Sequence, residues 1–590
     1  MNAPGRARLQ PLLYALFAAA TAFALALLQW GQQLNWDEIE FFRATKWIAG
    51  GQLPFRDYWE HHLPLQWLLF APVAAMFSNG PGAAAIVALR WAQLPLWLGA
   101  FVLLFALMRR CGLSQQARWT SLVCLLSSLW FVRSAIQYRV DVPAHLAYLL
   151  AVYLLVTRTT RRMSLAAGAL FSAAVLSNMR LAPLVVLTVL LFACWQPREE
   201  KWRWNAAALL VIAGGALVAI AFVAYLAITN SLDGFREGVL WYNTTTDRML
   251  PKEASSFLAR LGGPLVQRDL GGSALLLLGA IGAALALKNV VRPSLRVLIA
   301  LLAIASLITI AILGIQYEYH FQTTFLLLVP LAAIAIEQWR RATPLVLLIA
   351  AASLGITAVR MLPEFGAALR YQDRVMIEVD RRTNEGDRVW DSTGYALRRA
   401  PAYRYWFLAA GVRILADASL IEPYDIEQMI ANPPAAIVFN SRTQWWMAGR
   451  PRLAAYATHH YVPLYQHLWL PGMSGVVGPR QRVSWIVPRT GRYDVHVSEL
   501  LTKHPWFSAP SNYGLMSGAE LEIPLDRIPP APRAAFRWFV NGVPVEGPTL
   551  DLRKGASLQL VSMHPRPAGV FVVQHGTTKL SRMPDVVLPF

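Results

Sequence analysis

The chain has 590 residues, of which 56% are hydrophobic and only 15% are charged, and its mean hydropathy is +0.40. Soluble domains carry about 25% charged residues, so this composition excludes a wholly soluble protein and indicates a polytopic membrane protein. The formal net charge of +20 does not indicate a nucleic-acid-binding protein, because Lys and Arg occur in short segments between apolar runs and form no single basic face.

Eleven apolar runs predict a bundle of about eleven transmembrane helices. The runs lie at 11–30, 83–108, 119–135, 142–157, 164–179, 181–195, 205–229, 271–287, 297–315, 321–338 and 343–360. Basic residues concentrate in alternate connections, for example Arg109 and Arg110 after the second run and Arg340 and Arg341 before the last. The positive-inside rule therefore predicts a cytoplasmic N-terminus, with the loop 31–82 and the tail after residue 360 on the outer face.

The first outer loop carries an unusual number of titratable side chains for a connection between membrane helices. They are Asp37, Glu38, Glu40, Asp57, Glu60, His61 and His62. Such a density predicts a functional site. A structural alternative is that Asp37 caps a short helix, with Glu40 three residues later as in a capping box. For His61 and His62 after Glu60, metal or phosphate contact and interfacial hydrogen bonding both remain open.

One further apolar run, residues 63–77, is too short to count among the spans and is followed by SNGPG. Counting it would place Arg109 and Arg110 on the wrong side of the membrane. We therefore expect a helix that lies in the outer interface, with Trp67 at the level of the headgroups. A short, tilted span is the alternative.

Further polar residues lie in or near the other outer connections. Arg139 and Asp141 belong to QYRVDVPAH, and His320 belongs to IQYEYHFQTT. Because the outer loops of a helical bundle meet over its mouth, these residues are expected to converge with the first loop. Asp141 opens a membrane helix, so capping explains it equally well. Arg90 and Gln93 lie one turn apart inside the second run and should face the protein interior.

These residue types suit the transfer of a group away from phosphate. A carboxylate can accept the proton of an attacking hydroxyl, which is general-base catalysis. A phosphate leaving group needs positive charge near its oxygens, from Arg, protonated His or a divalent metal. A transporter or flippase should instead show paired, Gly/Pro-broken spans in two related halves, and the sequence shows no such repeat. A non-catalytic assembly scaffold would leave the acidic loop unexplained.

Residues 361–590 have the character of a soluble outer domain, with regular charges, many prolines and no run long enough to span a bilayer. Within 361–479, GDRVWDST and PAAIVFNS predict short strands between helices, which indicates an α/β subdomain. Within 480–590, WIVPRTGRYDVHVSEL, FRWFVNGVPVEG, TLDLRKGASLQLVSM and GVFVVQHG alternate as strands do, which predicts a β-sandwich subdomain.

Three motifs in the N-terminal third carry a family resemblance. An Asp-Glu pair follows the first span in WDEIEFF, the segment GGQLPFRDYWEHHLPL precedes the interfacial run, and an Arg-x-Asp stands in YRVDVP. Together they resemble the first outer loop of GT-C glycosyltransferases of the bacterial aminoarabinose transferase and protein O-mannosyltransferase type. The resemblance covers roughly residues 10–200, is looser over 200–360 and does not extend to the outer domain.

The resemblance implies a catalytic transmembrane domain over residues 1–360 in a bacterial inner membrane, with the C-terminal domain in the periplasm. Its donor would be a sugar on a polyprenyl-phosphate carrier, its acceptor a glycan, lipid or protein, and its other partners membrane lipids. The resemblance implies that Asp37 is the catalytic carboxylate, that Glu60 helps to build the site and that Asp141 lies near the donor. We expect Glu38 and Asp141 to act with Asp37 as catalytic residues, and Arg139, His61, His62 and His320 to bind the donor phosphate. In the aminoarabinose branch a phosphate-contacting Lys follows the Glu that matches Glu60. Here His61 stands in its place, so Glu60 and His61 are alternatively expected to hold a metal.

Overall fold

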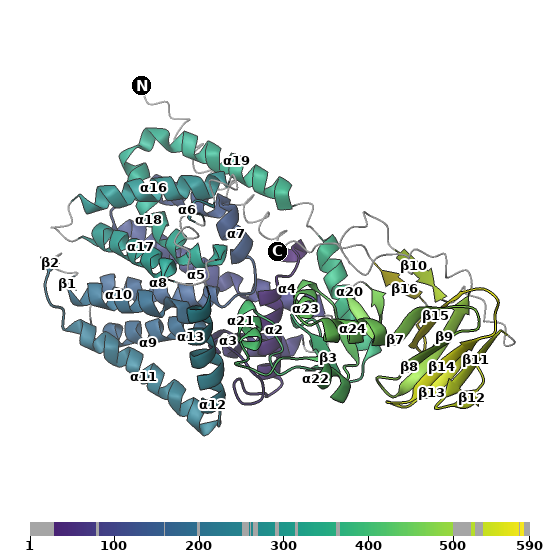
Figure 1. Cartoon of the computed structure of the whole chain (residues 1–590). Coiled ribbons are helices and arrows are strands. Elements are labelled where there is room, and N and C mark those ends of the chain that lie inside the picture. Colours follow the sequence, from purple (N-terminus) through teal and green to yellow (C-terminus); the bar gives the residue numbers. More distant parts are fainter. Residues whose placement is uncertain are drawn as a thin grey trace. The chain divides into compact units, whose positions relative to one another are not determined.

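The computed structural model divides the chain into two compact units, Met1–Leu369 and Arg370–Phe590. The structure describes residues 29–77, 82–157, 160–196, 201–250, 259, 261–263, 269–288, 294–312, 317–361, 366–465, 467–498, 521–525, 535–577 and 579–582. The first unit is helical apart from one two-stranded pair, β1 (Trp195–Gln196) with β2 (Lys201–Trp202), and the second contains the other strands (Figure 1).

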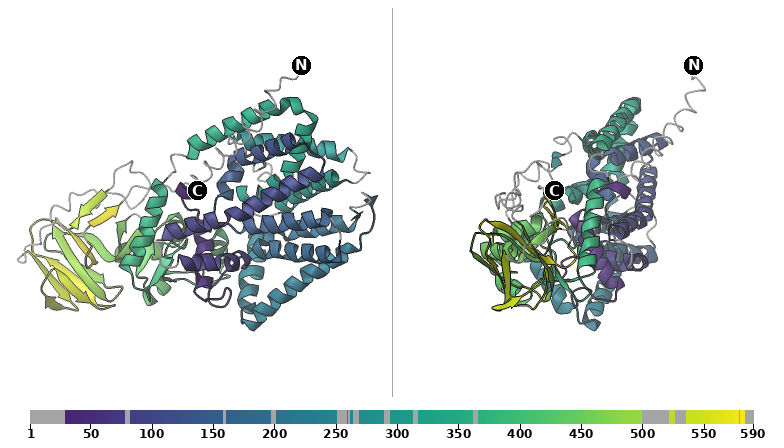
Figure 2. Two further views of the ribbon diagram at one scale, coloured as in Figure 1. Left: turned by 180° about the vertical axis from the view of Figure 1, so that it is seen from behind. Right: turned by 90° about the vertical axis from the view of Figure 1, so that its right-hand side faces the viewer.

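The first unit is a stack of packed helices, seen from two further directions in Figure 2. Its longer helices are α2 (Trp36–Ala49), α3 (Leu65–Met76), α4 (Gly82–Ala92), α5 (Leu94–Arg110), α6 (Gln115–Ser127), α7 (Leu129–Ala135), α8 (Asp141–Thr157), α9 (Arg161–Ser177), α10 (Ala182–Ala193), α11 (Ala207–Ile228), α13 (Tyr242–Met249), α16 (Leu270–Leu287), α17 (Leu295–Ala311), α18 (Gln322–Gln338) and α19 (Thr343–Met361). One apolar core joins α5, α6, α8, α9, α16, α17 and α18. Nearly every residue of α18 is buried, so this helix lies at the centre of the bundle.

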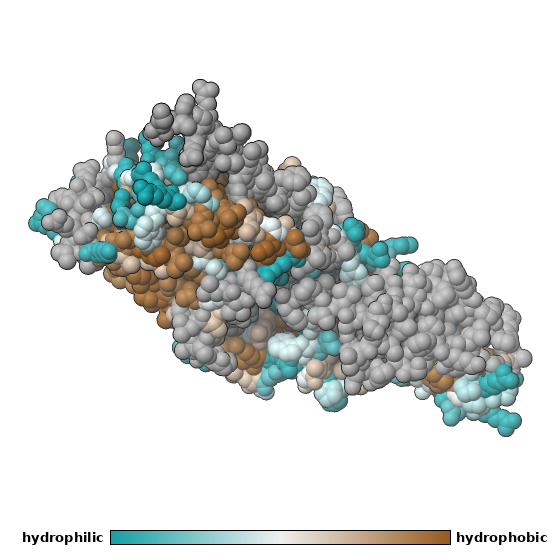
Figure 3. Space-filling view, turned by 90° about the horizontal axis from the view of Figure 1, so that it is seen from above, coloured by the Kyte–Doolittle hydropathy of each residue, from teal (hydrophilic) through white to brown (hydrophobic). Residues whose placement is uncertain are grey.

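The outside of this bundle is apolar, as a lipid environment requires. On α11, Leu217, Ile220 and Val223 are each more than half exposed, and Figure 3 shows a broad hydrophobic surface. Among the described residues, five helices are long and apolar enough to cross a membrane. They are Gly82–Arg110, Ala207–Ile228, Leu270–Leu287, Glu318–Gln338 and Arg340–Arg360. The chain is a membrane protein.

Helices lie at ten of the eleven predicted runs, and all but the last two residues of the run 11–30 lie outside the described residues. The prediction of one continuous helix over 119–135 is wrong. Ser128 has an extended backbone between α6 and α7, its side chain caps α7, and its hydroxyl donates a hydrogen bond to Asp269 at 2.8 Å. A buried carboxylate from a distant part of the chain therefore stabilises the break.

The short run after the first loop forms α3, which packs against α2. Trp67 lies on the packed side of α3 and is fully buried, whereas Leu68 and Leu69 face outwards. Trp67 therefore packs inside the protein, and its position at headgroup level stays a prediction. Arg90 and Gln93 are both buried, which confirms that they face the interior.

The second unit begins within α20 (Ala367–Arg382) and contains two larger sheets. The first runs in the order β13-β9-β15-β7-β5-β3-β4, and the second in the order β12-β11-β14-β8. Its elements are β3 (Arg388–Asp391), β4 (Ala400–Pro401), α21 (Ala410–Asp417), α22 (Ile426–Ala431), β5 (Ala436–Val438), α23 (Ser441–Ala448), α24 (Pro451–His460), β6 (Tyr461–Tyr465), β7 (Leu468–Val477), β8 (Arg482–Ile486), β9 (Gly491–Ser498), β10 (Leu521–Pro524), β11 (Phe536–Val540), β12 (Val543–Val545), β13 (Thr549–Leu552), β14 (Ser557–Ser562), β15 (Ala568–Gln574) and β16 (Lys579–Arg582).

The predicted strand segments of this unit are strands, and the larger sheet contains strands from both sides of residue 480. β3 pairs in parallel with β4 and with β5. β7 pairs antiparallel with β5 on one side and with β15 on the other, so the parallel strands and the later antiparallel strands belong to one sheet. A common apolar core, which includes Trp485 of β8 and Val570 of β15, joins the antiparallel strands of the two sheets.

Candidate active site

The start of α2 is fixed by a capping box, which places Asp37 and Glu38 in the first turn of the helix. Asn35 is the N-cap: its side chain accepts a hydrogen bond from the Asp37 amide at 2.9 Å, and Glu38 accepts from the Asn35 amide at 2.9 Å. The capping box therefore consists of Asn35 and Glu38. The alternative in which Asp37 caps the helix with Glu40 is wrong, because Asp37 lies inside the first turn.

Glu38 is fully buried and its carboxylate is occupied on both oxygens. Arg90 donates to them from Nε at 2.6 Å and from Nη2 at 2.7 Å, and the Tyr138 amide donates at 2.8 Å. Arg90 also donates to the backbone carbonyls of Gln29 and Gln32. These bonds join α2, α4 and the segment after α7, which favours a positioning role for Glu38 over the predicted catalytic one.

Asp37 meets Arg139 and Asp141, about a hundred residues further along the sequence, in one chain of ion pairs. Arg139 donates from Nη1 to Asp37 at 3.1 Å and from Nε to Asp141 at 3.0 Å. Gln93 fixes the Arg139 backbone through its amide and carbonyl, and Asn178 donates to Asp141 at 2.7 Å. The side chain of Asp37 is 19% exposed, whereas those of Arg139 and Asp141 are 2% and 5% exposed.

The charge of Arg139 is secured by its neighbours. Burial lowers the pKa of this guanidinium, but Asp141 and Asp37 raise it by more, so the net direction is upward. The ring of Tyr319 covers the guanidinium, with the carbon Cζ 3.7 Å from the ring centre. Of the three charged groups, Asp37 is therefore the one that a substrate can reach.

A pocket opens on the other side of Asp141. Asn178, Arg180 and His320 contribute polar groups to its lining, and Leu181, Leu184 and Ile310 contribute apolar ones. Arg180 Nη1 lies 2.5 Å from His320 Nε2. The structure thus brings His320 to the site, as predicted, and adds Arg180, which the sequence analysis did not single out. Its only signal was a lone Arg between two apolar runs.

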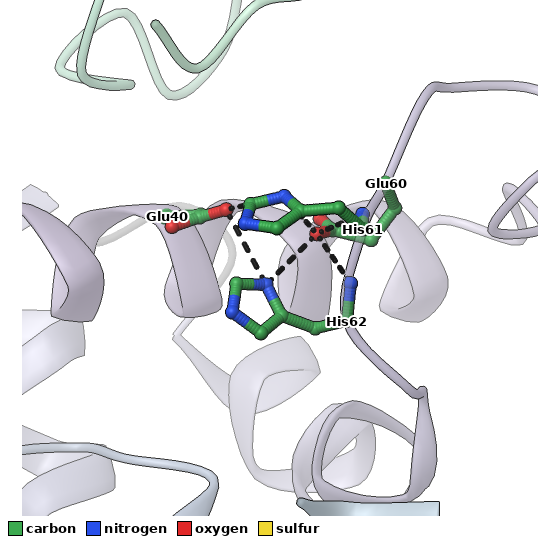
Figure 4. Close-up of side chains that lie close together, drawn as sticks. All are labelled: Glu40, Glu60, His61 and His62. Atoms are coloured by element: carbon green, nitrogen blue, oxygen red, sulfur yellow. Dashed lines mark hydrogen bonds and ion pairs between the residues drawn. The ribbon is translucent and has the colours of Figure 1, made fainter. Parts of the chain in front are cut away.

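A second group of titratable side chains lies further along α2. We call Glu40, Glu60, His61 and His62 the Glu/His cluster; Figure 4 shows the four side chains pointing toward one another. The Nδ1 atoms of His61 and His62 lie 3.5 and 3.6 Å from Glu40 Oε1, and 3.5 and 3.2 Å from Glu60 Oε1. Glu40 joins the three predicted neighbours because α2 brings it over the end of the loop.

The electrostatics of the Glu/His cluster couple its members. Burial raises the pKa of Glu40, and His62 opposes this rise. Burial lowers the pKa of His62, but Glu40 and Glu60 raise it by more, so the net direction is upward. Phe41 separates this cluster from the Asp37 group: its ring packs edge-on against His62 at 5.1 Å and lies 6.0 Å from the guanidinium carbon of Arg139.

The segment after α11 holds the loop that carries Glu60 and His61. It comprises α12 (Leu232–Phe235), the π-helix η2 (Arg236–Trp241) and α13. Asn243 donates to the His61 carbonyl at 3.0 Å, and a Cβ atom on Gly238 would lie only 2.0 Å from the Glu60 carbonyl oxygen. Only glycine permits this approach, and π-helical turns are frequent at functional sites.

Comparison with solved structures identifies the fold of the chain. No protein-family model and no curated protein matches the chain. Among solved structures, ArnT from Cupriavidus metallidurans in the apo state matches at 13% identity and a TM-score of 0.53, over 77% of this chain and 97% of that one. The chain has the GT-C fold. ArnT from the same organism bound to undecaprenyl phosphate matches at 13% identity and a TM-score of 0.50, over 74% and 94%.

This likeness confirms the resemblance that the first outer loop indicated. At 13% identity it establishes the fold of the chain. It also extends further than the motifs did, since 77% of the chain is more than residues 1–369 contribute and therefore includes part of the second unit.

Proposed function

We propose that the chain is an inverting glycosyltransferase that moves a hexosyl or pentosyl group from a polyprenyl-phosphate carrier to a glycan, lipid or protein acceptor. One observation carries the proposal: a GT-C fold presents a partly exposed carboxylate, Asp37, held by the buried Arg139. The undecaprenyl phosphate bound to ArnT in one matching structure supports a polyprenyl-phosphate donor for this chain too.

Asp37 acts as the general base. The acceptor hydroxyl attacks the anomeric carbon, its proton passes to Asp37, and the bond from that carbon to the phosphate oxygen breaks with its electron pair leaving on the phosphate. A single displacement of this kind inverts the configuration at the carbon. Arg139 orients the carboxylate through one oxygen, at 3.1 Å from Oδ2.

Arg180 and His320 receive the leaving phosphate. Arg139 already lies between two carboxylates, Asp37 and Asp141, and so has little positive charge left for an anion. Arg180 and His320 line the pocket beside Asp141 and lie within hydrogen-bonding distance of each other. An arginine and an imidazole there neutralise developing charge on phosphate oxygens.

The remaining predicted residues take supporting roles in this proposal. Asp141 positions Arg139, and Glu38 positions the start of α2 through Arg90. His61 and His62 face the carboxylates of Glu40 and Glu60, so they are not assigned to the donor phosphate.

The proposed setting is a bacterial inner membrane, with the N-terminus cytoplasmic and the site and C-terminal unit on the outer face. The basic residues in alternate connections support this orientation. A lipid or glycan transporter and an envelope scaffold are the rival functions, and neither requires turnover of a lipid-linked sugar.

The test uses purified full-length protein in lipid with a panel of radiolabelled polyprenyl-phosphate and polyprenyl-diphosphate sugars. The proposal expects release of the carrier from at least one monophosphate donor when extracts containing acceptor are added. It also expects the transferred sugar to have the opposite anomeric configuration to the donor, determined by NMR. Retention of configuration would contradict the single displacement, and no turnover across the panel would favour the scaffold or transporter.

A further inference from the structure

We infer that the Glu/His cluster is a four-ligand site for a divalent transition-metal ion of the Zn²⁺ type, with one oxygen each from Glu40 and Glu60 and Nδ1 each from His61 and His62. The inference stands on the geometry of the cluster and is independent of the proposed sugar transfer. The four ligating atoms all lie within 4.8 Å of one another.

The separations of the ligand atoms fit tetrahedral coordination. Zinc bonds of about 2.0–2.1 Å to imidazole and carboxylate imply about 3.3–3.4 Å between adjacent ligand atoms of a tetrahedron. The four carboxylate-to-imidazole distances in the cluster are 3.2, 3.5, 3.5 and 3.6 Å. Four of the six edges of the tetrahedron are therefore present before any side chain moves.

Hydrogen bonds account for only part of the buried carboxylate oxygens of the cluster: Glu60 Oε1 accepts from the His61 and His62 amides at 2.8 and 3.3 Å and lies 3.2 Å from His62 Nδ1. Glu40 and Glu60 are each 1% exposed. Among the described residues, Glu40 Oε1 and Glu60 Oε2 have no hydrogen-bond partner, and the imidazole nitrogens nearest to Glu40 Oε1 are beyond 3.4 Å. A buried carboxylate oxygen without a donor is unfavourable, and a metal ion bound to Glu40 Oε1 supplies the missing contact there.

Charge and ligand type indicate the class of ion. Two carboxylates and two neutral imidazoles balance the charge of one divalent cation in a buried site. Imidazole suits Zn²⁺ and its first-row neighbours, whereas Mg²⁺ prefers six oxygen ligands with octahedral geometry. A mixed set of two nitrogens and two oxygens therefore selects a transition metal over Mg²⁺.

Such an ion would join the first loop to α2. Glu40 belongs to α2, one turn after Asp37, while the other three ligands belong to the end of the loop. Gly238 and Asn243 already fix the Glu60 and His61 backbone from the opposite side. The ion is therefore a positioning element for the helix that carries Asp37.

The test measures metal content and thermal stability of the full chain, purified without a histidine tag. After exposure to Zn²⁺ and removal of free metal, we expect about one zinc per chain by mass spectrometry. Glu40→Gln and His62→Gln should each reduce this at least five-fold. Asp37→Asn and His459→Gln, which changes an exposed histidine of the second unit, should retain it.

Wild-type protein gives a readout that does not depend on variant folding. A chelator should lower the melting temperature, Zn²⁺ should restore it in a concentration-dependent way, and Mg²⁺ should not, because an ion that binds only the folded state stabilises it. Fewer than about 0.1 zinc per chain in the wild type, or equal zinc in wild type, Glu40→Gln and His62→Gln, would overturn the inference. Loss of transfer in Asp37→Asn with full zinc separates this site from the proposed catalytic one.

Discussion

Asp37 and Glu38 are neighbours in the sequence, yet their environments differ in every respect that matters for function. Glu38 is fully buried, and Arg90 and two backbone amides occupy its oxygens. Asp37 is 19% exposed and is held through one oxygen by Arg139. Two adjacent carboxylates at the start of one helix thus divide into a buried, fully bonded group and a partly exposed group to which the proposal assigns the reaction. The comparison teaches that partner number and exposure, more than residue type, separate the two roles.

The largest expected effect on stability concerns the buried pair of Glu38 and Arg90. Arg90→Met leaves the Glu38 carboxylate buried without its cation, which should cost about 3–5 kcal/mol of stability. The melting temperature of the purified protein measures it. The double variant Glu38→Gln with Arg90→Met should recover part of the loss, because the uncompensated charge is gone.

Arg56→Met is the matched control for Arg90→Met. Arg56 pairs with Asp57 at the surface, where the two side chains are 43% and 30% exposed. Exposed ion pairs contribute little to the free energy of unfolding, so Arg56→Met should have the melting temperature of the wild type. Equal melting of Arg90→Met and Arg56→Met would show that the buried pair does not hold the start of α2.

A smaller effect is expected where the donor phosphate is proposed to bind. Arg180→Ala removes a charged donor from the pocket and should raise KM for the lipid-linked donor roughly ten- to hundred-fold, the range for one hydrogen bond to a charged group. Arg180→Lys keeps the positive charge, so its KM for the donor should lie between those of the wild type and Arg180→Ala. Steady-state kinetics with the active donor provide the measurement, and an unchanged KM in Arg180→Ala would remove Arg180 from the donor site.

The smallest expected effect concerns the support of the Glu/His cluster. Gly238→Ala introduces a Cβ atom 2.0 Å from the Glu60 carbonyl oxygen, so the loop must shift, at about 1–3 kcal/mol of stability. Gly355→Ala is the control, because a Cβ atom at that helical position meets no described atom within 4 Å. Melting curves compare the two, and a Gly238→Ala protein as stable as Gly355→Ala would contradict the close packing.

Much of the candidate site could be predicted from the sequence, because charged residues are conspicuous between membrane helices. Asp37, Arg139 and Asp141 were identified by this argument, and the structure brings them within hydrogen-bonding distance. The GT-C fold was likewise indicated, through the resemblance of the first-loop motifs to that family. Composition and spacing did not reveal which of these distant charged side chains pair with each other.

The missed or misassigned residues have physical reasons. Glu40 was counted among the titratable residues of the first loop and considered for a cap, but it was not grouped with Glu60, His61 and His62, because i to i+3 spacing suits both a capping box and a shared helix face. The structure gives the cap to Asn35 and Glu38. Arg180 stood alone between two apolar runs, and its partner His320 is 140 residues away. The break at Ser128 depends on Asp269, which no local pattern around Ser128 reveals.

The most direct test of the central claim compares carrier release by wild type, Asp37→Asn and Asp57→Asn with the same lipid-linked sugar donor. Asn at position 37 can still accept the hydrogen bond from Arg139 but cannot take a proton. We expect a rate loss of roughly 10²–10⁴-fold in Asp37→Asn, as for a lost general base, with an unchanged melting temperature. Asp57 lies in an exposed turn of the same loop, so Asp57→Asn should keep the wild-type rate. A fully active Asp37→Asn protein would contradict the account.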